Sequence, residues 1–121
     1  MKFVVITKDP DLEASAREGF HPSDECLCFF DWKPALEAAD GADLMFVDLM
    51  ATLIEPNKIG GYEQFALAKM AHPTACATPL VLIAPEEDYE LDFMVGWPDF
   101  VFGHVRRPVT YKIFRRASTW V

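Results

Sequence analysis

The fold of this chain is decided by the stretch Asp43-Leu44-Met45-Phe46-Val47-Asp48-Leu49-Met50. Its apolar centre is too short for a typical helix and is bounded by Gly41 and Asp48, a pattern that favours a strand buried in a parallel sheet. In an open α/β sheet, ligands and reacting groups gather where such strands end at their carboxyl edge. Asp48 is therefore the first candidate for a functional residue.

The composition indicates a single globular domain over residues 1–121, because hydrophobic residues make up 51% and charged residues 25% of the chain. A formal net charge of −8 without a basic stripe argues against nucleic-acid binding. No apolar run is long enough to span a membrane, and Met1-Lys2 leads straight into a strand-like segment without an export signal. We therefore expect a cytoplasmic protein with no nucleic-acid or membrane partner.

Strand and helix patterns alternate along the chain. Asp9 followed by Pro10, and later Asp31, are typical helix starts, and Gly41 is a typical helix end. Five strands with intervening helices predict a parallel, doubly wound sheet. Strands are expected at 2–7, 26–30, 44–47, 80–83 and 100–102, and helices at 10–19, 33–39, 62–71, from 85 to near 96 and from 110 onwards, with a long loop at 49–61.

Three landmarks, in order and at the right spacing, resemble the receiver domain of two-component response regulators over essentially the whole chain. The first is the opening segment from Phe3 to Leu12, and the second is the strand that ends at Asp48. The third is Arg107-Pro108, which stands where the family has a Lys-Pro pair. The resemblance implies a flavodoxin-like, five-stranded parallel sheet in the order 2-1-3-4-5 with helices on both faces. It also places Asp48 at the phosphoacceptor position.

The site departs from the family's pattern at every other position. A working receiver resembles a small Mg²⁺-dependent phosphotransfer site with two acidic residues after the first strand, a hydroxyl after the fourth and a lysine after the fifth. Here the acidic pair falls on Thr7 and Lys8, the hydroxyl on Ala84 and the lysine on Arg107. The resemblance therefore implies a degenerate pocket, a pseudo-receiver, around Asp48.

Electrostatics suggests what these departures do. A divalent ion about 5 Å from one carboxylate gains roughly 6–7 kcal/mol at an effective dielectric near 20, and an ammonium in place of a second carboxylate opposes binding of the ion. We therefore predict no metal site, with Lys8 in the position of the ion and paired directly with Asp48. Asp9 is better explained as a helix cap than as a substitute ligand. Two alternatives stay open: a strand-end Asp48 satisfied by backbone amides, and a live acceptor.

The sequence favours partner binding over catalysis. No nucleophile, base and orienting group can be assembled, so we do not expect an enzyme, and we expect no cofactor. The leading hypothesis is a phosphorylation-independent protein–protein interaction module for a signalling partner. It could also form a homodimer through the fourth helix, fifth strand and fifth helix, as the resemblance implies for receiver output. The interface candidates are Trp97, His104, Arg106 and Tyr111, and residues 103–106 are predicted to be a contact loop.

The main alternative is a response-regulator receiver that a histidine kinase phosphorylates on Asp48 in a phosphorelay, with Mg²⁺ as cofactor. A small flavodoxin-like ligand-binding protein is a more distant one. Cys26 and Cys28, two apart on one strand, point to the same face, and we expect them to be reduced and packed in the core. The three histidines have no ligand spacing and are expected in turns at the surface.

Overall fold

The computed structural model describes residues 1–54, 60–86 and 101–120. Its five strands form one parallel sheet in the order β2-β1-β3-β4-β5, which confirms the predicted flavodoxin-like topology. The strands are β1 (Lys2–Ile6), β2 (Glu25–Phe29), β3 (Leu44–Asp48), β4 (Leu80–Ala84) and β5 (Val101–Arg106). The helices are α1 (Pro10–Gly19), α2 (Trp32–Ala38), α3 (Leu49–Thr52), α4 (Gly60–Ala71) and α6 (Tyr111–Arg116), with short 3-10 turns η1 (Ala75–Ala77) and η2 (Ala117–Thr119).

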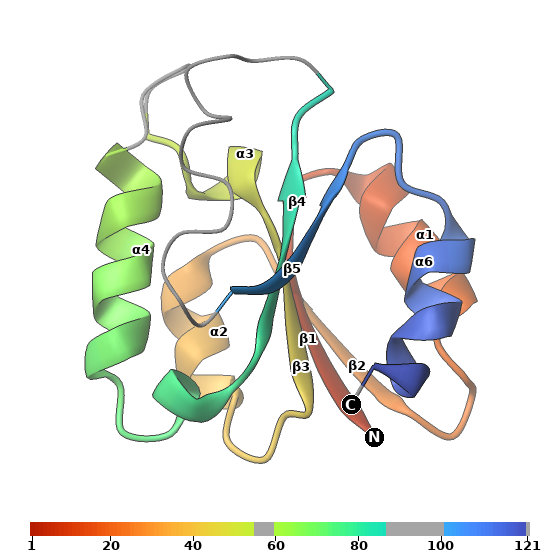
Figure 1. Cartoon of the computed structure of the whole chain (residues 1–121), viewed down its shortest axis with the longest axis horizontal. Helices are drawn as coiled ribbons and strands as arrows, with labels where there is room; N and C mark the ends of the chain where they lie inside the picture. The colour runs from red at the N-terminus through yellow and green to blue at the C-terminus, as the bar shows by residue number, and fades with distance from the viewer. Residues whose placement is uncertain (55–59, 87–100, 121) are drawn as a thin grey trace.

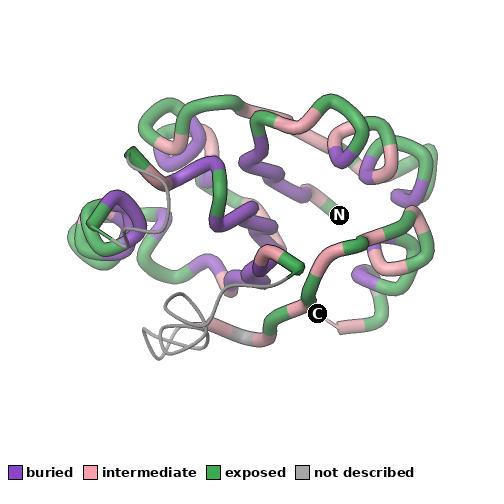
Figure 2. Tube along the Cα trace, turned by 90° about the horizontal axis from the view of Figure 1, so that it is seen from above, coloured by how far each residue is buried: buried purple, intermediate pink, exposed green. Residues whose placement is uncertain are grey.

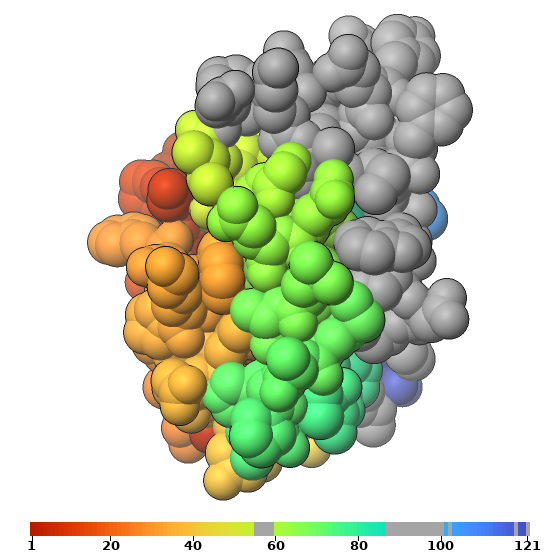
Figure 3. All heavy atoms as spheres, turned by 90° about the vertical axis from the view of Figure 1, so that its left-hand side faces the viewer, coloured from red at the N-terminus to blue at the C-terminus, as the bar shows by residue number. Residues whose placement is uncertain are grey.

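Helices cover both faces of the sheet. Figure 1 shows α1 and α6 on one face and α2 and α4 on the other. The central strands β1, β3 and β4 are almost continuously buried, and the helices turn their buried residues inward (Figure 2). The α2 and α4 face, which Figure 3 views from outside, encloses a core that includes Val47 and Phe65. The α1 and α6 face encloses Phe46, whose ring packs at a tilt against the rings of Phe20 and Phe114.

Local chemistry places the helix starts as the sequence predicts. The Asp9 carboxylate accepts a hydrogen bond from the Asp11 amide, and Pro10 opens α1. The Asp31 carboxylate accepts from the Lys33 amide at the start of α2. Each cap satisfies an amide that the helix itself leaves unpaired. Both helices therefore begin just beyond the carboxyl ends of β1 and β2, which fixes the edge where Asp48 lies.

The structure corrects two segments. Residues 103–106, predicted to be a contact loop, belong to strand β5, which pairs with β4 as far as Ala84 and Arg106. The loop predicted after Asp48 begins with a turn of helix, α3. The predicted helix from 85 to near 96 falls mostly outside the described residues.

Gly61 sits at a close approach between α4 and the segment after α3. A Cβ built on Gly61 would lie 2.1 Å from the carbonyl oxygen of Thr52, whereas one on the neighbouring Gly60 would meet nothing within 4 Å. We expect Gly61→Ala to lower the free energy of unfolding by about 1–3 kcal/mol, since backbone atoms would have to move. Gly60→Ala, the matched control, should be neutral or slightly stabilising. Urea denaturation of both variants tests this, and equal effects would contradict the close packing.

Lys69 carries the one fully buried amine among the described residues. It is 0% exposed, its Nζ donates a 2.6 Å hydrogen bond to the carbonyl of Thr78, and burial lowers its pKa to about 8. Between pH 8 and 10.5 the unfolded lysine keeps a proton that the folded one has lost, so stability should rise with pH in this window. We expect the stability of the wild type relative to Lys69→Met to increase by about 3 kcal/mol from pH 7 to 10.5. Denaturation at a series of pH values measures this difference, and a flat difference would show that Lys69 titrates normally.

Candidate functional site

Asp48 lies at the carboxyl end of the central strand β3, where it also caps α3. Its side chain is only 3% exposed. The Oδ1 atom accepts a hydrogen bond from the Met50 amide at 3.2 Å, so one carboxylate oxygen is held by the start of α3. The Oδ2 atom accepts two further bonds, one from Thr7 and one from Arg107. A carboxylate buried this deeply requires such partners, because an unpaired buried charge is costly.

Arg107 links the two carboxylates of the site. Its Nη2 donates to Oδ2 of Asp48 and its Nη1 donates to Oδ2 of Asp9, each at 2.7 Å. The Arg107 amide donates to the carbonyl of Ala84 at 3.0 Å, which anchors the residue against the end of β4. Distances of this length are typical of charge-assisted hydrogen bonds, and the planar guanidinium can hold two acceptors at once.

Thr7 completes a closed ring of hydrogen bonds. Its hydroxyl donates to Oδ2 of Asp48 at 2.8 Å and accepts from the Asp9 amide at 3.1 Å. Thr7 is itself buried, so this bond is shielded from water. The residues that follow the carboxyl ends of β1 and β5 and the last residue of β3 therefore hold one another through direct hydrogen bonds.

Electrostatics at the site favours the ion-paired state. The hydrogen bond from Arg107 lowers the pKa of Asp9, with a further contribution from the Asp11 amide at the helix start. Burial lowers the pKa of Arg107, but its hydrogen bonds and charge interactions with Asp9 and Asp48 outweigh this and raise the pKa overall. We therefore assign a permanent positive charge at this position, because an arginine stays protonated in proteins.

Lys8 does not take the position predicted for it. The predicted Lys8–Asp48 pair is wrong: Lys8 is exposed, and the ion pair of Asp48 is with Arg107. Thr7 turns its side chain inward at the end of β1, and Lys8, the next residue, faces a surface groove of about 490 Å³ that Phe30 and Trp32 also line. The cation beside Asp48 thus comes from the end of β5, not from the end of β1.

The remaining site residues show what chemistry the edge can support. Ala84 ends β4 and is buried, so the position carries no hydroxyl. Within residues 1–54, 60–86 and 101–120, no three side chains of His, Cys, Asp or Glu gather where they could hold a metal ion. The arrangement can bind and neutralise a carboxylate, but it offers a hard divalent cation few free oxygen ligands.

The predicted interface residues are spread over β5 and α6. His104 and Arg106 are exposed on β5, so His104 lies in a strand and not in a turn. The Arg106 guanidinium donates to the Pro85 carbonyl at 2.9 Å. Tyr111 opens α6 with the Arg115 guanidinium over its ring. Trp97 lies outside the described residues. His104, Arg106 and Tyr111 are not members of the hydrogen-bonded ring that Thr7, Asp9, Asp48 and Arg107 form.

No described helix has both the length and the apolar character needed to cross a bilayer. No protein-family model matches the chain, and no curated protein matches it. Among solved structures, the chain is similar to the chemotaxis response regulator CheY4 of Vibrio cholerae, with a TM-score of 0.71 and 15% identity over 98% of this chain and 95% of the other. It is also similar to the N-terminal domain of a response regulator receiver protein from Methanoculleus marisnigri, with a TM-score of 0.60 and 18% identity over 99% and 94%.

These similarities show that the chain has the fold of response regulator receiver domains, which confirms the resemblance seen in the sequence. At this level of identity they show the fold alone.

Proposed function

We propose that this chain is a receiver-like signalling module that binds a partner protein without being phosphorylated. The observation that carries the proposal is the bridge from Arg107 to both Asp9 and Asp48, 2.7 Å on each side. A receiver's acceptor carboxylate has to be reached by a metal ion and a phosphoryl donor. Here Oδ2 of Asp48 is occupied by the Thr7 hydroxyl and the guanidinium, and the side chain is nearly inaccessible.

The charge balance also supports a closed site. In place of a metal ion, the Arg107 guanidinium compensates the charge of Asp48. To bind Mg²⁺ there, the protein would have to break two charge-assisted bonds and leave the guanidinium next to a divalent cation, which repels it. Loss of the hydroxyl at position 84 removes the group that the family resemblance assigns to sensing the phosphoryl group.

The surface beside the closed site is suited to protein contact. Three large apolar side chains are exposed there: Phe30 just after β2, Met50 in α3, and Ile54 beyond it. We call these three residues the apolar rim. Phe30 and Ile54 line the same surface groove, and contiguous exposed aromatic and aliphatic side chains are common at protein interfaces. The partner we propose is a signalling protein, which docks on the rim or on the exposed face of β5 and α6.

A phosphotransfer assay tests the proposal. After incubation with acetyl phosphate and Mg²⁺, we expect the intact mass of the wild type to stay unchanged and equal to that of Asp48→Asn treated in the same way. An active receiver run in parallel shows that the reagents work. An aspartyl phosphate can hydrolyse before it is detected. A second readout therefore uses beryllium fluoride, a stable mimic of the phosphoryl group, and we expect it to leave the NMR spectrum of the backbone amides unchanged.

A mass increase of one phosphoryl group that is lost in Asp48→Asn would overturn the proposal. It would favour the alternative, a phosphorelay receiver that uses Mg²⁺ and is phosphorylated on Asp48 by a histidine kinase.

A further inference from the structure

A pair of thiols lies on strand β2, at the edge of the sheet. The Sγ atoms of Cys26 and Cys28 are 3.7 Å apart. Among the described strands, β2 pairs with β1 alone and forms one edge of the sheet. Both cysteines pack against the core between the sheet and helices α1 and α6, as the sequence suggested, but they are half-buried and not enclosed in it. We propose that Cys26 and Cys28 form a two-thiolate chelating site for a soft, thiophilic metal ion.

The distance between the sulfurs fits a chelate. In a tetrahedral site with metal–sulfur bonds of about 2.3 Å, two thiolates lie about 3.8 Å apart. The observed 3.7 Å therefore needs no movement of the strand. A disulfide would require the sulfurs to close to about 2.05 Å, and residues two apart on an extended strand have Cα atoms at the upper limit that a disulfide tolerates. The geometry thus favours a bridging ion over an S–S bond.

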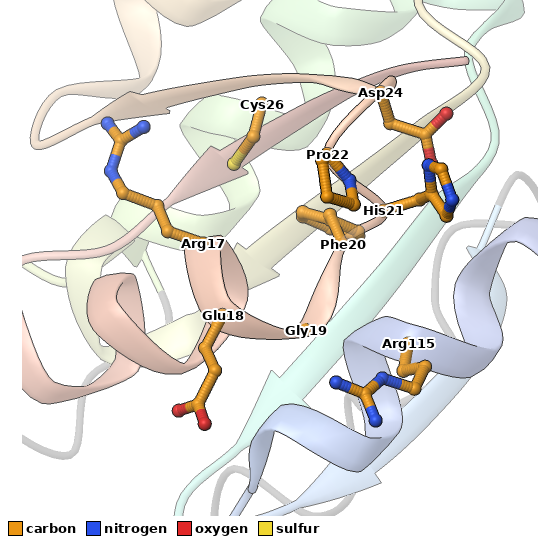
Figure 4. Close-up of a pocket in the computed structure, with 9 residues that line it drawn as sticks. All are labelled: Arg17, Glu18, Gly19, Phe20, His21, Pro22, Asp24, Cys26 and Arg115. Atoms are coloured by element: carbon orange, nitrogen blue, oxygen red, sulfur yellow. The ribbon is translucent and has the colours of Figure 1, made fainter.

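The surroundings favour a thiolate. The Cys28 thiol hydrogen-bonds to Cys26 and, with a smaller effect from the Arg17 guanidinium, lowers the pKa of Cys26, while the pKa of Cys28 is raised by the same pairing and by burial. Figure 4 shows Cys26 pointing from β2 toward α1, with Arg17 beside it, in an open pocket of about 670 Å³. Because metal ions bind thiolates and not thiols, binding of the ion releases the thiol protons, and the affinity for the ion should rise with pH.

The proposed site should discriminate between metal ions by their preference for sulfur over oxygen ligands. Thiolates prefer ions such as Zn²⁺, Cd²⁺ and Cu⁺, whereas Mg²⁺ and Ca²⁺ require oxygen ligands. Arg17 is held by Glu13 at 3.1 Å, and no third side chain of His, Cys, Asp or Glu completes the site among the described residues. Water or a small thiol would fill the other positions of the ion, so binding should be weaker than at a four-cysteine zinc site.

Titration with Cd²⁺ under a non-thiol reductant tests the site through the ultraviolet charge-transfer absorption of Cd²⁺–thiolate bonds. We expect one Cd²⁺ per chain in the wild type and in Cys76→Ser, the control that removes the exposed third thiol. Cys26→Ser and Cys28→Ser should each weaken binding by roughly 100-fold or more, since a single ligand loses the chelate advantage. Excess Mg²⁺ should not displace the ion, and binding should strengthen as the pH rises.

A monosubstituted trivalent arsenical gives a second readout that does not depend on metal affinity. It condenses with two thiols, forming two As–S bonds and releasing water, so the wild type should gain one adduct by intact mass and each single serine variant should not keep it. Circular dichroism checks that the variants fold. An unchanged Cd²⁺ affinity in Cys26→Ser or Cys28→Ser, or the absence of both Cd²⁺ absorption and arsenical adduct in the wild type, would overturn the proposal.

Discussion

Replacing Arg107 by methionine should lower the free energy of unfolding by about 3 kcal/mol. The substitution keeps an apolar stem but leaves the Asp48 carboxylate, 3% exposed, with only a hydroxyl and an amide as partners. Removing one member of a buried ion pair costs much more than the pair contributes, because the remaining charge has no compensation. Urea denaturation at neutral pH measures the loss. A change of less than about 1 kcal/mol would show that Asp48 does not depend on Arg107.

Arg106→Met is the matched control. Arg106 is the neighbouring residue of the same type, but it is exposed, and its guanidinium donates to the backbone carbonyls of Pro85 and Glu86. We expect its replacement to cost well under 1 kcal/mol. A similar loss of stability in both variants would show that the effect comes from disturbing the end of β5, and not from breaking the pair between Arg107 and Asp48.

The effect of Arg107→Met should also depend on pH. Arg107 lowers the pKa of Asp9, so the stabilisation from this pair is complete above the ordinary aspartate pKa of about 4 and is lost as the pH falls through the lowered value. The stability difference between wild type and Arg107→Met should therefore shrink as the pH drops below about 4.

A second large effect is expected from rebuilding an ion site. Lys8→Asp combined with Arg107→Lys should give saturable Mg²⁺ binding in the millimolar range, whereas we expect no binding by the wild type. The two changes shift the net charge of the side chains at positions 8, 9, 48 and 107 from zero to −2, and they remove the fork that bridges Asp9 and Asp48. Calorimetric titration measures the binding.

The single variants separate the two contributions. Lys8→Asp alone should bind Mg²⁺ much more weakly than the double variant, because Arg107 would still form its ion pair with Asp48. If Lys8→Asp alone binds as well as the double variant, then Lys8, and not Arg107, is the group that excludes the ion.

Local sequence signals were sufficient to predict the strands and the helix starts, whereas the strand order followed from the family resemblance. The apolar runs at Leu44–Asp48 and Leu80–Ala84, and the caps at Asp9 and Asp31, carry signals local to a few residues, and the structure has the predicted strands and helix starts in these places. The position of Asp48 at the carboxyl edge followed from the end of its own strand. These features depend on neighbours in sequence, so one chain was enough to find them.

The partner of Asp48 depends on contacts between distant segments and was missed. Lys8 and Arg107 both lie near the carboxyl edge of the sheet. Both are positively charged, so charge alone does not indicate which of them pairs with Asp48. The alternation of side chains along an extended segment could have identified the partner. If the Thr7 side chain points into the site, the side chain of the next residue, Lys8, has to point away from it. The same alternation over 101–106 could have revealed that this segment continues β5.

A double-mutant cycle between Arg107→Met and Asp48→Asn tests the closed site most directly, because it isolates the interaction of these two side chains from the other effects of each substitution. We predict a coupling free energy of about 2 kcal/mol for this pair, and a coupling within about 0.5 kcal/mol of zero for Lys8→Met with Asp48→Asn. A negligible coupling between Arg107 and Asp48, or a larger one between Lys8 and Asp48, would contradict the account.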